Sequence, residues 1–340
     1  MPPIFDAYQE ESNFALSAVR AAARLGTRVQ AAMVTSELIK EDRSPVTVAD
    51  FACQALVSHQ LEAAFPDDPL VAEESSRSLQ GKAAESVRRA VRQHLADTLG
   101  EATDAQVDAW IDRGQGQPAQ RFWTLDPVDG TAGFLRHQHW VVALALIEDG
   151  LVNVAALACP RLDFGRSGDN VGSDGSVAVA VRGGGAWGGA LESDELTPLH
   201  VSDCAAPSEA RLLASVEAGH TNLDQLHALE AALGVSAPPV RMDSQAKYAA
   251  LANGQGELIF RLLSPAKPDY REKIWDQAAG SLIVEEAGGR VSDLQGNRLD
   301  FSAGRTLARN TGVLVSNGML HSQALEALAN IGADRPAEGD

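Results

Sequence analysis

The segment that decides the fold is FWTLDPVDGT, residues 122–131, in which apolar side chains are followed at once by two aspartates, a proline and a glycine. The apolar run predicts a buried strand that ends at Asp126. The Asp-Pro and Asp-Gly pairs predict a turn, and a short helix should follow. Because the turn reverses the chain, Asp126 and Asp129 can point into one pocket. An ordinary turn and a ligand site explain these residues equally well on their own.

Backbone groups of the same turn suit a phosphate and its cations. Pro127 fixes the turn, which leaves the Val128 carbonyl free to serve as a further oxygen ligand. Gly130 and Thr131 would present their N–H groups at a helix start, where anions bind. The segment therefore predicts a site that combines cation ligands with an anion-binding turn.

The composition is that of a globular protein with an acidic excess. The chain has 340 residues, 46 of them Asp or Glu and 28 Lys or Arg, and a formal net charge of −18. This charge repels nucleic-acid strands, whereas abundant carboxylates suit hard divalent cations. Three widely spaced cysteines without a C-x-x-C motif indicate a reducing compartment. We see neither a signal peptide nor a membrane span, and expect a cytoplasmic protein.

The order of the expected elements divides the chain into two α/β units. Residues 1–193 should form an α+β unit with long helices at 8–37 and 47–64 and a mixed or antiparallel sheet. Residues 194–335 alternate short strands with helices, which is typical of a mostly parallel sheet. The first unit would carry most of the metal ligands, and the second would carry Asp276 and the nucleotide-binding residues.

Carboxylates outside the central segment lie at further strand ends and helix starts. Asp50 closes a possible capping box that begins at Thr47, Glu73 follows a short buried strand, and Asp276 precedes a helix that it could cap. Each of these residues has a plain structural explanation. The complete set comes from four separate elements, however, and it suits shared Mg²⁺ ions.

Several of these segments resemble a known superfamily. Leu125–Thr131 and Trp275–Gly280 are similar to the two motifs of the lithium-sensitive, magnesium-dependent phosphatases, which include inositol monophosphatases and fructose-1,6-bisphosphatases. Ser44–Asp50 and Glu73–Ser75 resemble the intervening elements in the same order. The resemblance runs from about residue 10 to residue 330. It implies an α/β fold, a layered α-β-α-β-α sandwich.

Other segments resemble one branch of this superfamily, the 3'(2'),5'-bisphosphate nucleotidases. These segments are Gly133–Arg136, Gly219–Thr221, Asp243–Tyr248 and Tyr270–Trp275. The branch implies hydrolysis of adenosine 3',5'-bisphosphate to AMP and phosphate, with the 3'-phosphosulfate analogue as a second substrate. The expected partner is thus a small nucleotide bisphosphate rather than a nucleic-acid polymer or a membrane, and the oligomeric state is left open. Gln277 departs from the branch, which frequently has His there.

The resemblance also implies a role for each site residue. Two or three Mg²⁺ ions would be held by carboxylates and one carbonyl, those of Glu73, Asp126, Val128, Asp129 and Asp276. Asp50 and the Thr131 hydroxyl would orient a metal-bound water and relay its proton. The substrate would contact Gly130, Thr131, His220, Ser244, Lys247, Arg261 and Asp276.

Three other functions fit these segments less well. A related phosphatase acting on inositol phosphates or fructose bisphosphate is disfavoured by the segments around His220, Ser244 and Lys247. Gly183–Gly188 matches the G-x-G-x-x-G of dinucleotide-dependent oxidoreductases, but residues 190–198 are too short and broken for the helix that this motif needs. A glycine turn between strands is favoured there. A non-catalytic metabolite-binding protein would not need the water-activating pair.

Overall fold

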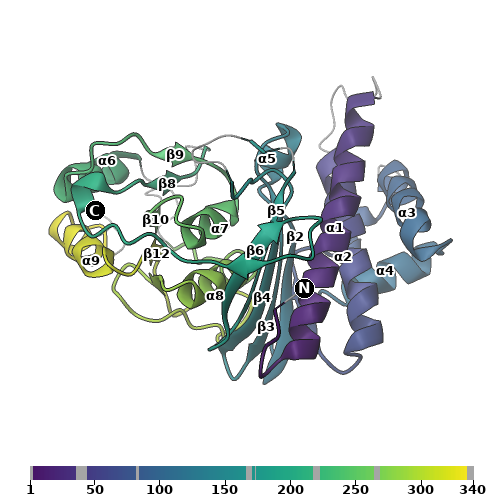
Figure 1. The fold of residues 1–340 in the computed structure, drawn as a ribbon. Helices are drawn as coiled ribbons and strands as arrows, with labels where there is room; N and C mark the ends of the chain where they lie inside the picture. Colours follow the sequence, from purple (N-terminus) through teal and green to yellow (C-terminus); the bar gives the residue numbers. More distant parts are fainter. Residues whose placement is uncertain are drawn as a thin grey trace.

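The computed structural model describes residues 3–35, 44–81, 84–165, 171–172, 174–216, 223–263 and 269–334. In these ranges helices and sheets alternate in layers, which confirms the predicted α-β-α-β-α sandwich (Figure 1). The layers are α1 with α2, a large sheet, α7 with α8, a smaller sheet, and α6 with α9, while α3 and α4 pack outside α2. The described helices are α1 (Gln9–Thr35), α2 (Ser44–Ala64), α3 (Glu85–Leu99), α4 (Asp104–Asp112), α5 (Thr131–Leu135), α6 (Leu223–Leu233), α7 (Ala246–Ala252), α8 (Ala278–Glu286) and α9 (His321–Asn330).

The large sheet has the mixed, mainly antiparallel pairing that the sequence predicted. Its strands follow one another in chain order from β1 to β7. Only β1 and β2 are parallel, and each of the other neighbouring pairs is antiparallel. The strands are β1 (Leu70–Ala72), β2 (Arg121–Asp129), β3 (Val141–Glu148), β4 (Leu151–Cys159), β5 (Ser176–Val181), β6 (Gly185–Ala190) and β7 (Thr197–Pro198).

Both faces of this sheet are covered, which explains why its strands are apolar without alternation. Along β3, Leu144 and Leu146 enter the core beneath α1 and α2, whereas Ala145 and Ile147 enter the core shared with α7 and α8. Successive side chains of a strand point to opposite faces, so a strand between two helical layers needs apolar residues at every position. The sheet thereby forms a rigid centre from which the site projects.

The smaller sheet layer corrects one prediction, because it consists of a two-stranded and a three-stranded sheet and is parallel only in part. β8 (Leu213–Ala214) and β9 (Val240–Arg241) are parallel, but β12 (Val313–Ser316) pairs antiparallel with both β10 (Leu258–Arg261) and β11 (Arg290–Ser292). The crossover through α8 makes β10 and β11 run in the same direction. The chain then returns through residues 293–312, and β12 lies between these two strands, antiparallel to both.

Two local predictions are wrong. The capping box at Thr47–Asp50 does not begin a helix, because α2 already starts at Ser44. Pro45 is compatible with that start, since a proline in the first turn of a helix loses no hydrogen bond. The strand that was expected to end at Asp126 continues as β2 to Asp129. The glycine turn after β5 is confirmed, and it leads into β6 rather than into a helix, as the dinucleotide motif would require.

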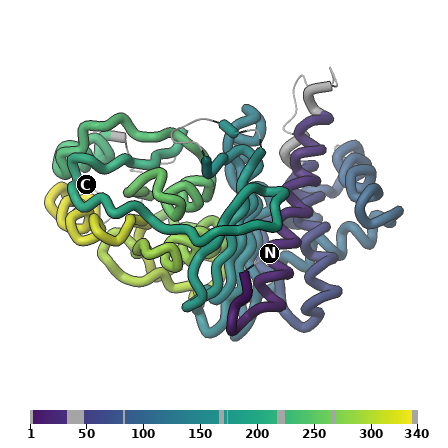
Figure 2. Tube along the Cα trace, viewed as in Figure 1, coloured from purple at the N-terminus to yellow at the C-terminus, as the bar shows by residue number. Residues whose placement is uncertain are grey.

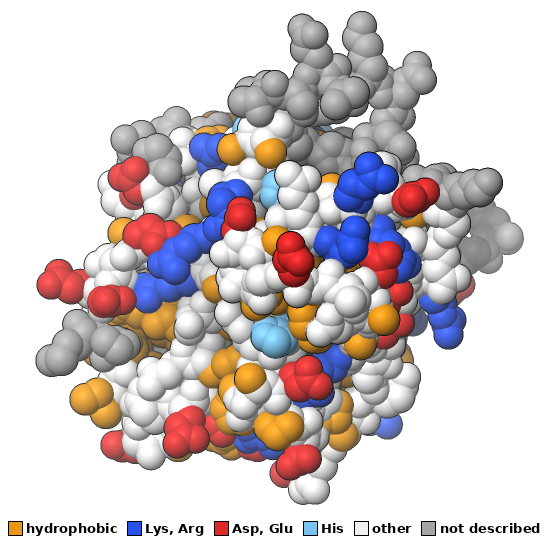
Figure 3. Space-filling model, turned by 90° about the vertical axis from the view of Figure 1, so that its right-hand side faces the viewer, with side chains coloured by type: hydrophobic (Ala, Val, Ile, Leu, Met, Phe, Trp, Pro, Cys, Tyr) orange, Lys and Arg blue, Asp and Glu red, His pale blue; other side chains and the backbone are white. Residues whose placement is uncertain are grey.

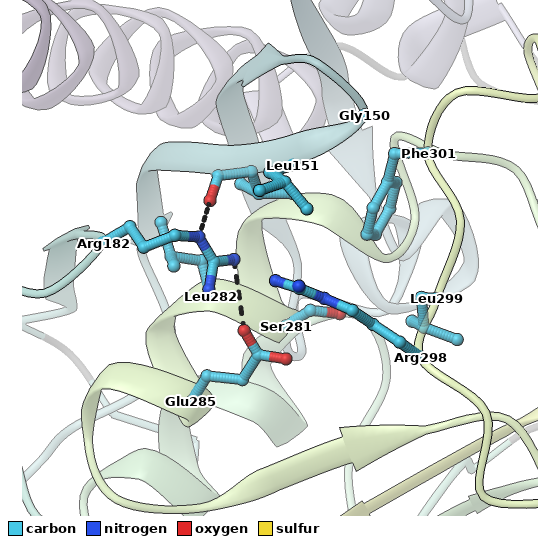
Figure 4. A pocket seen from close by; sticks show the side chains of 10 residues that line it. Gly150, Leu151, Arg182, Ser281, Leu282, Glu285, Arg298, Leu299 and Phe301 are labelled. Carbon is cyan, nitrogen blue, oxygen red and sulfur yellow. Dashed lines mark hydrogen bonds and ion pairs between the residues drawn. The ribbon is translucent and has the colours of Figure 1, made fainter.

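Helix α8 is fastened to the large sheet at the β5–β6 turn (Figure 4). Arg182 donates from Nε to the Val152 carbonyl oxygen at 2.7 Å and from Nη2 to the Glu285 carboxylate at 3.2 Å. Glu286 accepts hydrogen bonds of 2.9 Å from two backbone amides of the same turn. These contacts fix the helix whose first turn follows Asp276, and so they limit how far that residue can move from the sheet.

The outer surface mixes charges of both signs. The helical side in Figure 3 carries interspersed acidic and basic side chains, and Arg88 of α3 pairs with Asp108 of α4 at 2.9 Å. The trace in Figure 2 places the N-terminal and C-terminal helices at opposite ends of the layers. None of the described helices has both the length and the apolar character needed to cross a membrane. Acidic side chains are concentrated instead inside a cavity.

Candidate active site

A bulge at the end of β2 presents two carboxylates. Asp126 lies opposite Ala143 of β3 and Asp129 lies opposite Val141, with a shift of register between them. A bulge of this kind redirects side chains next to active sites. The Asp126 Oδ1 atom accepts a hydrogen bond from its neighbour two residues on, the Val128 amide, at 3.1 Å. This local contact orients the first carboxylate before any ligand arrives.

Gly130 makes the sharp turn from β2 into α5. Its φ of 93° is in the left-handed region, which favours glycine. A Cβ atom on this residue would lie 2.9 Å from the Ser244 Cβ and 3.2 Å from the His139 carbonyl oxygen. The turn therefore has no space for a side chain, and it brings the start of α5 against the loop before α7.

One cavity of about 580 Å³ lies at this junction. Its lining residues come from α2, β2, α5, α7 and β10, from the segment that follows β1, and from the segments around Ser215 and Asp276. Its predicted members are Asp50, Glu73, Asp126, Val128, Asp129, Gly130, Thr131, Ser244, Lys247, Arg261 and Asp276. His220 lies outside the described residues. The structure thus brings every described member of the predicted site to one cavity.

Burial and mutual repulsion raise the pKa values of the clustered carboxylates. The pKa of Asp126, which is 3% exposed, is raised well above its ordinary value by burial and by the charges of Glu73 and Asp129. Burial and neighbouring acids likewise raise the pKa values of Asp50 and Asp276. Glu73 keeps surface accessible from the cavity, yet burial and nearby acids raise its pKa to about 7. Such a cluster holds unfavourable charge that a cation would neutralise.

The oxygen atoms that line the cavity suit a hard cation, although they do not yet surround a single ion position. Carboxylate and carbonyl oxygens are the ligands that Mg²⁺ prefers, and the cavity offers them from four elements. Among the described residues, no three His, Cys, Asp or Glu side chains already surround a single ion position. Bringing them to one ion therefore requires side-chain rotation, which the accessible Glu73 carboxylate allows.

Among the described residues, the basic side chains of Lys247 and Arg261 line the cavity on the side of the second half of the chain. Lys247 is 3% exposed, its Nζ donates to the Met242 carbonyl oxygen at 3.3 Å, and burial lowers its pKa to about 8. Arg261 donates to both carboxylate oxygens of Glu272, at 3.2 and 2.7 Å. Burial alone would lower the pKa of Arg261, but Glu272 raises it above its ordinary value. Arg261 therefore remains charged, whereas Lys247 titrates near neutral pH.

A buried network, not singled out from the sequence, holds these groups in place. The backbone N–H of Gln245 donates to Asp129 Oδ2 at 2.6 Å, and its side-chain Nε2 donates to the Trp275 carbonyl oxygen at 3.0 Å. Gln277 donates to Glu272 at 2.8 Å and accepts from the Tyr248 hydroxyl. The side-chain amide of Gln277, the residue that departs from the branch, therefore both donates and accepts a hydrogen bond within the buried network.

Other lining residues were also missed as members of the site. They are Glu74, Ala132, Leu135, Ser215, Asp243, Gln245, Tyr248, Tyr270 and Gln277. The segment Asp243–Tyr248 was the available signal, since it contains both Ser244 and Lys247. Asp243 is 6% exposed and accepts from Arg136 at 2.5 Å, a pairing between distant segments that no local pattern contains.

Comparison with known proteins assigns the chain to a family. The model of the inositol monophosphatase family matches residues 9–333. The chain belongs to this family. A 3'(2'),5'-bisphosphate nucleotidase of Schizosaccharomyces pombe is 38% identical to it, over 97% of this chain and 98% of the relative. A protein of the same name from Oryza sativa is 41% identical over 94% of each chain. The predicted superfamily is confirmed.

Solved structures share the fold of this chain. SuhB of Mycobacterium tuberculosis has a TM-score of 0.64 and 18% identity, and the match covers 97% of this chain and 100% of that one. An inositol monophosphatase from Anabaena has a TM-score of 0.58 and 20% identity, with 94% of each chain covered. At such identities the likeness concerns the architecture alone.

Neutralising one buried carboxylate should stabilise the metal-free protein. Because the folded-state pKa of Asp126 is raised, its ionisation destabilises the fold as pH rises above the unfolded-state value, at about 1.4 kcal/mol for each pKa unit. We expect Asp126→Asn to increase the free energy of unfolding by about 1–2 kcal/mol at pH 8 in EDTA, and by less at pH 5. Urea unfolding measures both values.

The matched control is Asp97→Asn, at an exposed position of α3. This variant should leave the stability within about 0.5 kcal/mol of the original at both pH values. If Asp126→Asn lowered the metal-free stability at pH 8, the cluster would not be under the repulsion described above.

Proposed function

We propose that this chain is a Mg²⁺-dependent phosphatase that removes the 3'-phosphate of adenosine 3',5'-bisphosphate, giving AMP and phosphate. The observation that carries the proposal is the single cavity in which carboxylates from four elements face Lys247 and Arg261. The relatives named 3'(2'),5'-bisphosphate nucleotidase, which align over nearly the whole chain, support the choice of substrate. We place 3'-phosphoadenylyl sulfate as a second substrate.

Oxygen ligands at the acidic side of the cavity would hold two or three Mg²⁺ ions. The carboxylates of Glu73, Asp126, Asp129 and Asp276, together with the Val128 carbonyl, provide these ligands. When bound, the ions would supply positive charge to the phosphoryl oxygens and acidify a ligated water. The excess of acidic over basic side chains in the described lining of the cavity supports this assignment.

The protein groups around the ions would position the reactants and move the proton. Asp50 and the Thr131 hydroxyl would orient the attacking water and relay its proton. Asp50 is 7% exposed and lines the cavity together with Thr131, which supports a role for both beside the attacking water. The amides of Gly130 and Thr131 would donate to the phosphoryl oxygens as their charge redistributes.

The second-half residues would hold the nucleoside and its remaining phosphate. Ser244, Lys247 and Arg261 line the cavity, and His220 is assigned to the same group from the sequence. Charged donors are strong partners for phosphate oxygens. The pairing with Glu272 fixes the Arg261 guanidinium, so the arginine would meet the phosphate in one orientation. Asp276 would contact both the ions and the substrate.

We place this reaction in the cytoplasm. Cys53, Cys159 and Cys204 are all unpaired, and free thiols persist in reducing compartments. Expression with a fluorescent tag, followed by fractionation, tests the assignment.

A substrate panel tests the proposed activity. We expect phosphate release from adenosine 3',5'-bisphosphate that requires Mg²⁺ and exceeds the release from inositol 1-phosphate or fructose 1,6-bisphosphate by at least about tenfold in kcat/KM, a difference of about 1.4 kcal/mol in transition-state binding. Asp126→Asn should reduce the rate by several orders of magnitude. Equal or better turnover of inositol 1-phosphate would overturn the substrate assignment, and binding without turnover would favour a metabolite-binding protein.

Substrate binding should weaken above pH 8. The pKa of Lys247 is lowered to about 8, so its positive charge is present below that pH and is lost as pH rises through it. We expect KM for adenosine 3',5'-bisphosphate to increase about tenfold between pH 7 and pH 9, the factor for a single titrating cation. Initial rates at saturating Mg²⁺ give this profile.

Two comparisons isolate the lysine. Lys247→Arg should flatten the rise, because a guanidinium stays charged over this range. Adenosine 3'-monophosphate, which has no second phosphate, should show a smaller change. A KM that is constant from pH 7 to pH 9 would rule out the assigned contact between Lys247 and the second phosphate.

A further inference from the structure

Arg305 connects the two parts of the chain that carry Glu73 and Asp276. The residue lies between β11 and β12, and it does not line the cavity. Its guanidinium carbon is 4.8 Å from the centroid of the Trp275 ring, the residue before Asp276. Its Nη2 atom donates to the carbonyl oxygen of Ala72, the residue before Glu73. One side chain therefore touches the immediate neighbours of two proposed metal ligands from opposite halves of the chain.

Further hydrogen bonds fix Arg305 on each side. Its Nη1 atom is 3.3 Å from the Gly114 carbonyl oxygen and 3.4 Å from that of Gly116. The segment with these glycines borders β1, because Ala72 donates its amide to the Gly114 carbonyl at 2.7 Å. On the other side, the Arg305 carbonyl oxygen accepts from the Ile274 amide at 3.2 Å. The contacts form a bridge from the end of β1 to the segment that leads into Asp276.

The chemistry of this bridge is specific to a guanidinium. Within the described residues Arg305 forms no ion pair. Its guanidinium instead donates to carbonyl oxygens and stacks on the face of an aromatic ring. A planar fork can donate to several carbonyls while it stacks on tryptophan, which the compact ammonium of lysine cannot do. Burial lowers the pKa of Arg305, because the charged guanidinium is partly removed from water.

We propose that Arg305 is a positioning residue that sets the separation between Glu73 and Asp276, and so prepares the cavity for its divalent ions. The proposal rests on the proposed function, because it assumes that these two carboxylates bind the ions together. Neither carboxylate has a direct contact with the arginine. Arg305 would instead hold the residue before each of them, the backbone of Ala72 through a hydrogen bond and the ring of Trp275 through stacking.

The test compares three variants of the full chain. Arg305→Met removes the charge and the fork, Arg305→Lys keeps the charge alone, and Arg309→Met changes an arginine of the same loop whose side chain is 71% exposed. Calorimetric titration with Mg²⁺ measures ion affinity without turnover. Steady-state kinetics then give kcat, KM and the Mg²⁺ concentration at half-maximal rate.

We expect Arg305→Met to weaken Mg²⁺ binding at least tenfold and to lower kcat by a similar factor, with KM for the nucleotide changed less than threefold. Arg305→Lys should show a loss of intermediate size, and Arg309→Met should behave as the unaltered protein. If Arg305→Met does not fold, Arg305→Lys carries the comparison. Thermal unfolding should show that the Mg²⁺-dependent rise in Tm shrinks in the Arg305 variants.

Two patterns would overturn the proposal. A Tm that falls equally with and without Mg²⁺, at unchanged Mg²⁺ affinity, would mean that Arg305 only stabilises the fold. Unchanged affinity and rates in a folded Arg305→Met would remove the role altogether. If the unaltered protein bound Mg²⁺ and Arg305→Met weakened that binding, but no phosphate ester was hydrolysed, the proposed function would fail while the positioning role stood.

Discussion

The rest of the structure depends on one electrostatic constraint: several acidic side chains are held close together around one cavity. Asp126 and Asp50 are almost fully buried, and burial together with neighbouring acids raises their pKa values. Isolated buried charge is among the most costly features that a fold can contain. A protein keeps such a cluster only if the surrounding structure is rigid enough to hold it, and if a ligand of opposite charge recovers the energy.

The layered architecture provides that rigidity. The large sheet is covered by helices on both faces, so that β2 delivers its two aspartates from a fixed position. Asp50 comes from a helix on one side of the sheet, and Asp276 precedes α8 on the other. Gln245 joins Asp129 to the segment before Asp276 through two hydrogen bonds. Hydrogen-bonded amides of this kind orient the carboxylates without adding charge.

The sequence predicted the parts of this arrangement that local chemistry encodes. Apolar runs gave the strands of the large sheet, and the Asp-Pro and Asp-Gly pairs marked the turn after Asp126, although the strand extends three residues further across a bulge. Pairings between distant segments were not accessible in the same way. The insertion of β12 between β10 and β11, the contact of Arg136 with Asp243 and the reach of Arg305 to Ala72 each depend on tertiary packing. A sequence pattern within one segment cannot predict these contacts.

The most direct test of the account locates the ions. Crystals of the protein equilibrated with Mn²⁺, as an anomalous scatterer in place of Mg²⁺, should show two or three peaks in the cavity, ligated by oxygens of Glu73, Asp126, Asp129 and Asp276. The carboxylates should have rotated toward the peaks, with the backbone of β2 unmoved. Peaks confined to the outer surface, with the four carboxylates still apart at saturating Mn²⁺, would contradict the claim that this cluster exists to bind divalent cations.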